Sequence, residues 1–588
     1  MKGPALPAPR HATVNDALAA AAATPSGLTF VDLHERESAL PFAAVRERAL
    51  RTSSALRGRG VAAGDRVALV FPTSPEFVDA FFGTLLAGAV PVPLYPPLRL
   101  GRLAEYHEST AAMIRAAGAR LVLAEARTRK LLGPAVAGAR PRLGCATLAE
   151  LASGRGGELG VHVDPASLAL IQFSSGSTTD PKPVALSHAN LVAQLTALGM
   201  MLPSERGNPH VGVSWLPLYH DMGLIGCLLL AVYVPGPLVL IAPEHFLVRP
   251  ALWLRAISRH RATLSLAPAF GYALAARRVR DDEVTGLDLS GWQMAGCGAE
   301  PISPAALRPF AERFGPLGFD EASLRPLYGL AEASLAVTAA PPGRGVRTLD
   351  LDSARLAAGE VVAGRRAVVS VGTPVAGFEV EVRGPDDRPL PEGRVGRIHA
   401  RGPSVMAGYF EQPRATAKVI RGGWLDTADL GFVAGGELYV CGREKDVVVI
   451  QGANHPAEEF ERCVEGLAGV RAGRVVAAGF TPDGESGERL LVLAERPKEV
   501  DDSADAATIA AVRSRILEHT GVGPHTIRLL EPGTLPRTSS GKLRRREALR
   551  RFLAGELTPP RRVGPLRMAV ELLRSAAAFA RTRFIRGR

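Results

Sequence analysis

A run of hydroxyl-bearing residues follows a short apolar segment in the first third of the chain. Residues 168–171 are Leu-Ala-Leu-Ile, a pattern typical of a buried strand. Residues 173–182 then read Phe-Ser-Ser-Gly-Ser-Thr-Thr-Asp-Pro-Lys. Backbone N–H groups and hydroxyls in such a turn form a concavity for an anion, most often a polyphosphate, and Lys182 adds a positive charge. A polar surface turn is the alternative. No Gly-Lys-Ser/Thr ends the segment, which excludes a Walker A loop.

The scarcity of lysine makes each lysine informative. Lysine occurs only at positions 2, 130, 182, 418, 445, 498 and 542, and the other basic residues are arginine. Lysine is a compact, movable point charge, whereas arginine is a planar fork. In a chain that prefers arginine, we expect a lysine inside a motif to serve its own chemistry. Lys182, Lys445 and Lys542 are the three that lie in motifs.

Length and composition favour a globular protein of two or more domains. The chain has 588 residues, 47% apolar and 22% charged, which is too long for one hydrophobic core. The amino-terminal segment has no continuous apolar run, so secretion is not expected. Residues 224–242 are charge-free and nearly long enough to span a bilayer. Pro235-Gly236-Pro237 divides them, which predicts a buried helix followed by a buried strand.

Charge and cysteine content bear on two further functions, nucleic-acid binding and metal-cluster binding. The net charge of +12 is compatible with nucleic-acid binding. No helix-turn-helix, zinc-finger or aromatic–basic RNA motif accompanies the charge, so we expect no nucleic-acid partner. The five cysteines are scattered without CxxC spacing, which fits a reducing cytoplasm and argues against a metal cluster.

Further motifs follow the hydroxyl-rich loop, and together they carry a resemblance to a known family. They lie at residues 214–226, 298–301, 328–332, 422–431, 442–446 and 535–543. In this order and at these distances they resemble the adenylate-forming superfamily of acyl- and aryl-CoA synthetases, luciferases and adenylation domains. The string Leu-Pro-Leu-Tyr-His-Asp-Met-Gly-Leu at residues 216–224 resembles the fatty acyl-AMP ligase branch.

The resemblance implies a nucleotide site for ATP. Its phosphates would meet a set of loop residues: Ser174, Ser175, Gly176, Ser177, Thr178, Thr179 and Lys182. Its adenosine would meet a second set: Gly298, Ala299, Glu300, Pro301, Tyr328, Gly329, Asp429 and Arg443. Within that set, Asp429 would accept both ribose hydroxyls. Glu332 would hold Mg²⁺, a hard cation that prefers oxygen ligands.

The resemblance also assigns catalytic and gating roles. Lys542 would be the adenylation lysine, and Lys445 the pivot of a hinge. His220 would place the fatty carboxylate, and an acyl pocket would begin at His220, Asp221, Met222 and Gly223. By composition alone, His220 and Asp221 are equally well explained as a structural pair in the hydrophobic core whose side chains hydrogen-bond to each other. The alternative for the segment around Lys542 is a basic surface loop without a catalytic role.

The implied fold is α/β. A large N-terminal domain of stacked α/β sheets with a barrel-like part would cover residues 1–442, and a hinge residues 443–446. A small, mobile C-terminal α+β domain would cover residues 447–556. Residues 66–71 have the pattern of a strand, and Ser74-Pro75 then mark the start of a helix. This succession independently favours parallel βαβ units.

Residues 343–369 bear on the thiol acceptor. Ordinary acyl-CoA ligases cross this interval in fewer residues, whereas fatty acyl-AMP ligases carry an insertion that hampers turnover with CoA. A tolerated surface insertion is the alternative. The implied partners are therefore a fatty acid and a holo acyl carrier protein, or the carrier domain of a polyketide or nonribosomal peptide synthase.

Two other functions remain open at this stage. An acyl-CoA synthetase would use CoA as the acceptor. A non-catalytic lipid- or protein-binding relative is the third function, because four residues depart from the family pattern: Thr179, Pro183, Ala428 and Pro456. Thr179, Pro183 and Ala428 stand where glycine is usual, and Pro456 stands where tyrosine is usual.

Residues 557–588 resemble nothing in the core family. Arg567, Arg574 and Arg581 recur every seven residues, which places them on one side of a helix. An apolar stripe would comprise Leu566, Val570, Leu573, Ala577, Ala580 and Phe584. Such a helix suits anionic lipid or an acidic carrier protein. Packing on the body, or a disordered end, is the alternative. We therefore expect a cytoplasmic protein, with peripheral membrane contact through this tail as an option.

Overall fold

The computed structural model describes residues 1–97, 100–152, 161–174, 181–203, 210–450, 453–482, 488–538, 542–560 and 564–586. Its largest sheet has nine strands in the order β17-β14-β13-β12-β11-β9-β10-β1-β2, and the run from β13 to β1 is parallel. These strands are β1 Gly27–Val31, β2 Glu37–Pro41, β9 Gly212–Ser214, β10 Leu238–Ile241, β11 Leu264–Ala267, β12 Met294–Cys297, β13 Leu324–Gly329, β14 Ala336–Ala339 and β17 Thr373–Pro374.

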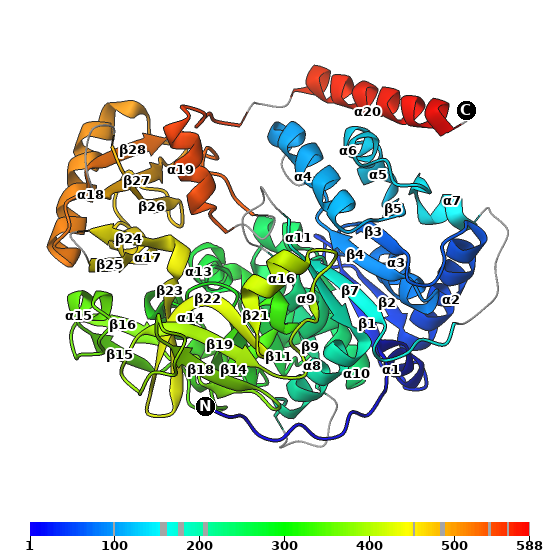
Figure 1. The fold of residues 1–588 in the computed structure, drawn as a ribbon, viewed down its shortest axis with the longest axis horizontal. Helices are drawn as coiled ribbons and strands as arrows, with labels where there is room; N and C mark the ends of the chain where they lie inside the picture. Colours follow the sequence, from blue (N-terminus) through cyan, green and yellow to red (C-terminus); the bar gives the residue numbers. More distant parts are fainter. Residues whose placement is uncertain are drawn as a thin grey trace.

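A second, fully parallel sheet lies beside the first, in the order β4-β3-β5-β6 (Figure 1). Its strands are β3 Arg66–Val70, β4 Val90–Leu94, β5 Leu121–Ala124 and β6 Gly144–Ala146. The predicted βαβ unit is confirmed. Helix α3, Pro75–Leu86, starts with Pro75 at its first turn, and the Ser74 side chain accepts a hydrogen bond from the Phe77 N–H.

Helices cover these sheets and connect their strands. In the first half of the chain they are α1 Val14–Ala21, α2 Phe42–Gly58, α4 Leu103–Ala116, α5 Ala126–Arg129, α6 Gly133–Ala139, α7 Leu148–Ala152, α8 His188–Met200, α9 Asp221–Gly223, α10 Leu230–Tyr233, α11 Pro243–Val248, α12 Ala251–Arg259 and α13 Ala269–Arg278. Further along they are α14 Pro304–Phe314, α15 Ser353–Ala357 and α16 Pro413–Val419.

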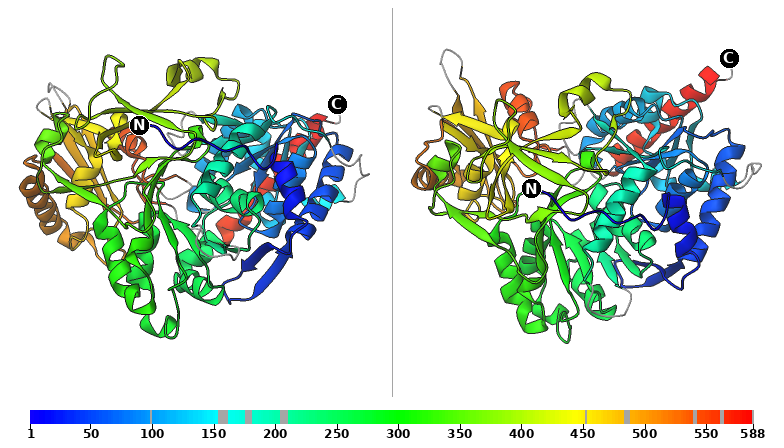
Figure 2. Two further views of the ribbon diagram at one scale, coloured as in Figure 1. Left: turned by 90° about the horizontal axis from the view of Figure 1, so that it is seen from below. Right: turned by 60° about the horizontal axis from the view of Figure 1, so that its bottom comes forward.

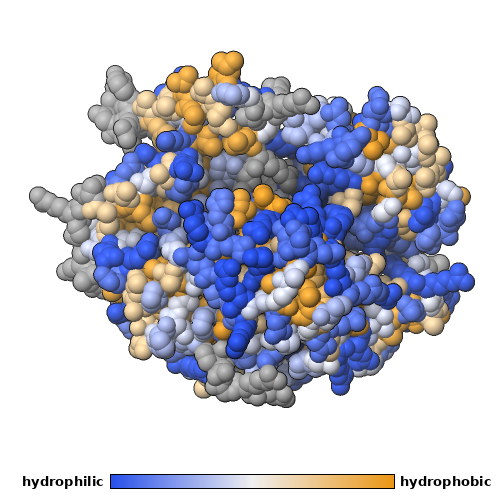
Figure 3. Space-filling model, turned by 180° about the vertical axis from the view of Figure 1, so that it is seen from behind, coloured by the Kyte–Doolittle hydropathy of each residue, from blue (hydrophilic) through white to orange (hydrophobic). Residues whose placement is uncertain are grey.

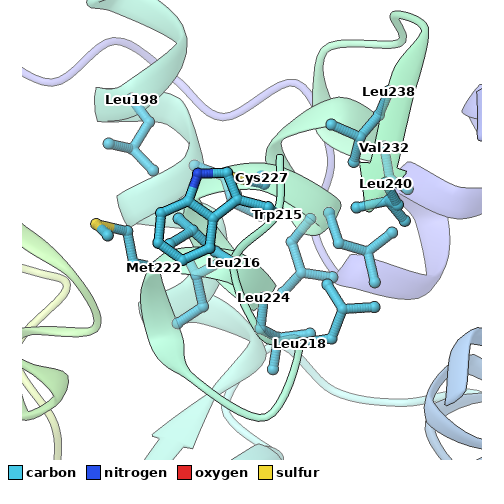
Figure 4. Packing of buried hydrophobic residues seen from close by; sticks show 14 of the residues in the cluster. Leu198, Trp215, Leu216, Leu218, Met222, Leu224, Cys227, Val232, Leu238 and Leu240 are labelled. Atoms are coloured by element: carbon cyan, nitrogen blue, oxygen red, sulfur yellow. The ribbon is translucent and has the colours of Figure 1, made fainter. Parts of the chain in front are cut away.

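Residues 224–242 form buried helix and strand, as predicted. A π-helical segment, Leu224–Leu229, leads into α10, and β10 follows the Pro235–Pro237 break. Their side chains belong to the main hydrophobic core. Figure 4 shows part of this core, with Leu198, Trp215 and Met222 grouped on one side. In the part of the chain that the structure describes, no helix is long and apolar enough to cross a membrane.

An antiparallel sheet supplies the barrel-like part. Its strands are β18 Glu379–Arg383, β19 Gly396–Arg401, β21 Ile420–Arg421, β22 Trp424–Ala434 and β23 Glu437–Arg443. A smaller antiparallel sheet has the order β20-β8-β7, with β7 Leu168–Phe173, β8 Pro183–Ser187 and β20 Gly408–Tyr409. The β7–β8 hairpin brackets the hydroxyl-rich loop. A further hairpin, β15 Thr348–Leu351 with β16 Arg366–Val369, lies within residues 343–369.

Residues beyond 446 build a smaller body with its own hydrophobic cluster, which includes Val448, Phe460, Val492 and Ile516 (yellow to orange in Figure 1). It contains β24 Val447–Ile450, β25 Ala453–Pro456, β26 Val475–Phe480, β27 Arg489–Glu495, β28 Thr526–Leu530, α17 Ala457–Cys463, α18 Asp505–Thr520 and α19 Arg545–Leu553. The fold is thus the expected α/β arrangement of a large N-terminal and a smaller C-terminal domain. The domain boundaries given above stay predictions.

The tail forms helix α20, Pro565–Arg586, as the heptad spacing predicts. It does not lie on the C-terminal body that precedes it. Instead, α20 packs on the N-terminal part, chiefly against α6 (red in Figure 2). At the opposite end of the chain, residues before α1 run along the surface, where the Gly3 N–H donates to the Phe378 carbonyl.

Candidate active site

One cleft gathers most of the predicted site residues. Those that line it are Ser174, Lys182, His220, Asp221, Met222, Gly298, Ala299, Glu300, Pro301, Tyr328, Gly329, Glu332, Asp429, Arg443, Lys445 and Lys542. Gly223 is absent from the lining. The predicted phosphate-binding residues Ser175, Gly176, Ser177, Thr178 and Thr179 lie outside the described residues.

At one corner of the cleft, a buried carboxylate joins two strands. Asp429 on β22 accepts a hydrogen bond from the Tyr328 hydroxyl at 2.8 Å and from the Arg443 Nε at 2.9 Å. Burial and the nearby Asp429 charge raise the pKa of Tyr328, so its hydroxyl stays a donor. The Asp429 charge raises the pKa of Arg443. This corner presents an aromatic face, an acceptor and a cation together, which suits a ribose and its base.

Strained backbone occurs at three residues in or next to the predicted motifs. Ala299, Ser334 and Ala428 have φ of 68°, 67° and 57°, in the left-handed region that non-glycine residues rarely adopt. Strain of this kind clusters at functional sites, where the surrounding structure holds it. The position of Ala428 therefore does require a positive φ, as its replacement of the usual glycine suggested. Gly329 is required for a different reason, because a Cβ there would collide with the Leu335 carbonyl oxygen.

A second corner combines a cation, an aromatic ring and a carboxylate. The Lys182 Nζ lies 5.0 Å from the centre of the Tyr409 ring, and the Tyr409 hydroxyl donates to Glu332 Oε1 at 2.9 Å. Burial and the Glu332 charge raise the pKa of Tyr409. The Ser174 N–H donates to the Lys182 carbonyl at 3.4 Å, which closes the base of the hydroxyl-rich loop. The charges of Lys182 and Glu332 thus flank one space.

Glu332 fits a hard cation. Its carboxylate lines the cleft, and among the described residues only Tyr409 donates a hydrogen bond to it. Carboxylate oxygens are the kind of ligand that Mg²⁺ prefers. No cluster of three or more His, Cys, Asp or Glu with metal-binding geometry occurs in the described residues. Mg²⁺ would accordingly depend on Glu332 together with phosphate oxygens.

A third corner holds a histidine against an aspartate. The His220 Nδ1 lies 2.6 Å from Asp221 Oδ1, and the Met222 N–H donates to the same carboxylate oxygen at 2.7 Å. Burial alone would raise the pKa of Asp221, but His220, Lys542 and the Met222 N–H together lower it. The aspartate is therefore held as an anion that orients the His220 ring, and the other ring nitrogen, Nε2, is left for a ligand.

Lys542 reaches this cleft from the C-terminal body. Its backbone is held by Thr538, whose N–H donates to the Lys542 carbonyl at 2.8 Å and whose Oγ1 accepts from the Lys542 N–H at 3.0 Å. Enclosure lowers the pKa of the Lys542 ammonium, and the Arg443 charge lowers it further. The carboxylates of Glu300, Asp221 and Asp429 act in the opposite direction. The ammonium thus stands among groups from four of the other predicted motifs.

Glu300 faces Lys542 across the cleft. Its Oε1 accepts a hydrogen bond from the Phe270 N–H at 2.7 Å. Burial raises the pKa of Glu300, although the Phe270 N–H and the Lys542 charge oppose that shift. Glu300 and Lys542 are thus close enough for each charge to shift the pKa of the other.

Beyond His220 the cleft lining turns apolar. The residues that continue it are Leu198, Met201, Trp215, Met222, Leu230, Leu264, Leu266, Phe270, Leu274, Met294 and Leu335. Gly226 lies on the π-helical segment, and a Cβ there would crowd the Leu335 side chain. Leu264 and Met294 stand at the starts of β11 and β12, so the apolar lining runs along the face of the large sheet. Such a surface suits an aliphatic chain whose polar end is at His220.

Charged contacts join the two bodies in this arrangement. Arg551 on α19 pairs with Glu105 on α4 at 2.8 Å. Arg102 donates to the carbonyls of Gly533, Thr534 and Thr558. At the predicted hinge, the pKa of Lys445 is lowered by burial and by Arg443.

The segment 343–369 also meets the C-terminal body. Its α15 packs on β25, and the buried Arg366 on β16 lies 3.3 Å from the equally buried Glu459 on α17. Leu356 on α15 is buried with Phe432 and Tyr439 of the barrel-like part. The segment is therefore no free surface loop, because it bridges the two bodies.

The model of the AMP-binding enzyme family matches residues 18–410. The chain belongs to this family. A protein of Caulobacter vibrioides that is named as an acyl-CoA synthetase is 37% identical over 554 residues, which cover 92% of this chain and 96% of that protein. The 4-hydroxyphenylalkanoate adenylyltransferase of Mycobacterium tuberculosis is 34% identical over 84% of this chain and 83% of its own length. The medium-chain-fatty-acid–[acyl-carrier-protein] ligase JamA of Moorena producens is 31% identical over 84% and 86%.

Solved structures agree with the family assignment. A structure from a study of fatty acyl-adenylate ligases of E. coli and L. pneumophila has a TM-score of 0.87 at 34% identity, and covers 93% of this chain and 99% of that one. The resemblance to the fatty acyl-AMP ligase branch of the superfamily is thereby confirmed. As a member of the AMP-binding family, the chain is an enzyme of the adenylate-forming class, which uses ATP.

The cleft of this AMP-binding enzyme also contains residues that the sequence did not single out. Tyr409 joins Lys182 to Glu332, and the Phe270 N–H holds Glu300. Neither Tyr409 nor Phe270 lies in a motif with distinctive spacing, and Tyr409 follows Glu332 by 77 residues. Only the fold brings them to the cleft. Ser334 is buried outside the cleft lining; it carries backbone strain two residues after Glu332, and its Oγ donates to the Ser404 carbonyl at 2.6 Å.

Proposed function

We propose that this enzyme activates a medium- or long-chain fatty acid as an acyl-adenylate and then passes the acyl group to the phosphopantetheine thiol of a carrier protein. One observation carries the proposal. Lys542, from the C-terminal body, stands with Asp221 beside His220 and with Asp429 beside the nucleotide corner. A single movable cation therefore lies between the place for a carboxylate and the place for an adenosine.

In the first half-reaction, the fatty carboxylate oxygen attacks the α-phosphorus of ATP, and pyrophosphate leaves. Both reactants are anionic, so the enzyme must neutralise and align them. The Nε2 of His220 orients the carboxylate, while Lys542 balances the charge that develops on the attacking and bridging oxygens. Asp429, Tyr328 and Arg443 hold the ribose and adenine. When bound, Mg²⁺ on Glu332 supplies charge neutralisation at the phosphates.

In the second half-reaction, a thiol attacks the acyl carbonyl carbon, and AMP leaves. Lys542 is not needed for that step, because the carbonyl is already activated. We infer that the C-terminal body then turns about the segment that contains Lys445, which withdraws Lys542 and admits the thiol, a gating step of a common kind.

Two observations support a carrier protein over CoA. The segment 343–369 contacts the C-terminal body through Arg366 and Glu459, and the family resemblance associates an insertion at this place with poor turnover of CoA. The similar JamA is a ligase for medium-chain fatty acids and an acyl carrier protein. The apolar lining between His220 and Met294 supports an aliphatic acid as the substrate.

An acyl-CoA synthetase is the second candidate, because the Caulobacter relative bears that name. The discriminating experiment supplies ATP and fatty acids of several lengths, with CoA, holo carrier protein and apo carrier protein offered separately. The proposal expects acid-dependent pyrophosphate exchange and acyl transfer to the holo carrier only. Rapid acyl-CoA formation without carrier loading would establish the synthetase instead. Absence of pyrophosphate exchange with every acid would leave a non-catalytic binding protein.

A further inference from the structure

Helix α20 is anchored to the body by one specific face. The Gly133 N–H on α6 donates to the Ser575 Oγ at 2.8 Å, and Ser575 is buried. The Arg129 guanidinium lies 5.3 Å from the centre of the Phe579 ring. A Cβ on Gly133 would collide with the Ser575 carbonyl oxygen, so glycine is what allows α20 to approach α6. This docking determines which side of α20 faces outward.

The outward side is the predicted apolar stripe. Successive helical residues turn by about 100°, which places Leu566, Val570, Leu573, Ala577 and Ala580 opposite Ser575. Leu566, Val570 and Leu573 are 86%, 45% and 70% exposed. Figure 3 shows apolar side chains gathered along the upper edge, where α20 lies. The stripe does not pack on the body. For Phe584, the sixth predicted member of the stripe, the structure describes the helical backbone but not the side chain.

The charge of the tail points to the chemistry of its partner. Residues 557–588 contain eight arginines and one glutamate, a net charge of +7 out of +12 for the whole chain. Arg567, Arg574 and Arg581 border the stripe on one side at seven-residue spacing. A helix of 22 residues is about 33 Å long, so the stripe presents aliphatic side chains along an extended line beside a basic edge.

We propose that α20 binds an anionic lipid surface, with its stripe in the acyl boundary and its arginines at the headgroups. This geometry is that of an interfacial amphipathic helix, in which apolar burial and attraction to anionic lipids act together. Because the opposite face is already held by Ser575 and Phe579, the enzyme would sit at the membrane as one unit. A lipid surface accounts for both features together, because its headgroups attract the arginines and its acyl boundary takes up aliphatic side chains such as Leu566.

The test is co-sedimentation of the full chain with vesicles of phosphatidylcholine alone or mixed with phosphatidylglycerol. The test variant is Leu566→Ser/Val570→Ser/Leu573→Ser, which keeps every charge. The matched control, Val248→Ser/Leu517→Ser/Leu553→Ser, removes side chains that are 69%, 50% and 62% exposed elsewhere. Equal thermal unfolding midpoints would show that all three proteins are folded.

The expected result is binding to the mixed vesicles that weakens as salt is raised, with little binding to phosphatidylcholine alone. The α20 variant should bind the mixed vesicles at least about 10-fold more weakly, and the control should match the wild type. Equal sedimentation of the wild type and the α20 variant would overturn the proposal. So would a variant that keeps vesicle binding but loses loading of an acidic carrier protein, since the stripe would then belong to a protein partner. Vesicle co-sedimentation does not depend on catalysis by the proposed function, so failure of the lipid proposal and failure of the proposed function can be told apart.

Discussion

At the scale of single residues, the chemistry depends on one ammonium held among anions. Lys542 must be charged to balance the transition state, and its pKa is lowered from the ordinary 10.5 by enclosure and by Arg443. The charged form is therefore lost as pH rises through a value below 10.5. We expect the rate of acid-dependent pyrophosphate exchange to fall along an alkaline limb at that pH.

Two substitutions test this assignment. Lys542→Ala should lower the exchange rate by about 10²-fold or more, the usual effect of losing a positioned charge donor. Lys542→Arg should be slower than wild type but should lose the alkaline limb, because arginine stays protonated in this range. Transfer from chemically prepared acyl-adenylate to a thiol should stay near the wild-type rate in both. Pyrophosphate exchange of ordinary rate in Lys542→Ala would contradict the role.

Ala428 gives a second prediction at this scale. An L-residue in the left-handed region costs about 1–2 kcal/mol, while glycine adds about 0.5–1 kcal/mol of chain entropy to the unfolded state. Ala428→Gly should therefore raise the free energy of unfolding by about 0.5–1 kcal/mol and lower the KM for ATP. Denaturant unfolding and exchange kinetics measure both. Ala434→Gly in the same strand, where φ is negative, should destabilise instead; equal effects at the two positions would refute the strain argument.

Much of the candidate site could be predicted from sequence motifs, but Tyr409 and Phe270, which contact the motif residues, could not. Motif residues such as Asp429, Glu332 and Lys542 sit in strings whose spacing is distinctive, and the fold does place them in one cleft. Tyr409 and Phe270 act through a hydroxyl and a backbone N–H that arrive from remote segments. No local pattern marks such residues, because their role depends only on which strands and helices become neighbours.

At the scale of elements, the sequence predicts a helix or strand correctly where neighbouring residues alone determine its start and end. Ser74 and Pro75 mark the start of α3 because they satisfy helix-terminal requirements by themselves. Helix α17, Ala457–Cys463, begins only after Pro456, because Pro456 belongs to β25 and pairs with Val447. The tail stripe was predicted correctly as a pattern, but its outward direction follows from the contact of Ser575 with Gly133, which no periodicity contains.

The contact between the inserted segment and the C-terminal body yields a prediction about the acceptor. Arg366 and Glu459 form a buried pair, and removing one partner alone would leave a buried charge. The double variant Arg366→Leu/Glu459→Leu removes the ionic link without that penalty. We expect it to form acyl-CoA at least severalfold faster than wild type, with pyrophosphate exchange unchanged, as a coupled CoA assay measures. Unchanged acyl-CoA formation in a stably folded double variant would show that this link does not restrain the acceptor step.

At the scale of the whole molecule, the two bodies are held so that Lys542 lies inside the cleft. Part of the restraint is the ion pair between Glu105 and Arg551, which joins α4 to α19. Surrounding charges lower the pKa of Glu105: burial opposes the shift, while Arg551 and Arg102 produce it. The pair should therefore be intact at neutral pH and should weaken as pH falls through the lowered pKa of Glu105.

A double-mutant cycle of Glu105→Gln and Arg551→Gln isolates the contribution of this pair. Partly exposed pairs contribute up to about 1 kcal/mol, so the coupling in the pyrophosphate-exchange rate should be at most about fivefold. Because the pair favours the closed arrangement, its loss should slow exchange yet leave transfer from acyl-adenylate to the thiol equal or faster. The exposed pair Arg280–Asp282, neutralised as Arg280→Gln/Asp282→Asn, should change neither rate. If exchange and transfer slowed together in the cycle, Glu105 and Arg551 would be supporting the fold in general, and control of domain position would have to lie in the hinge itself.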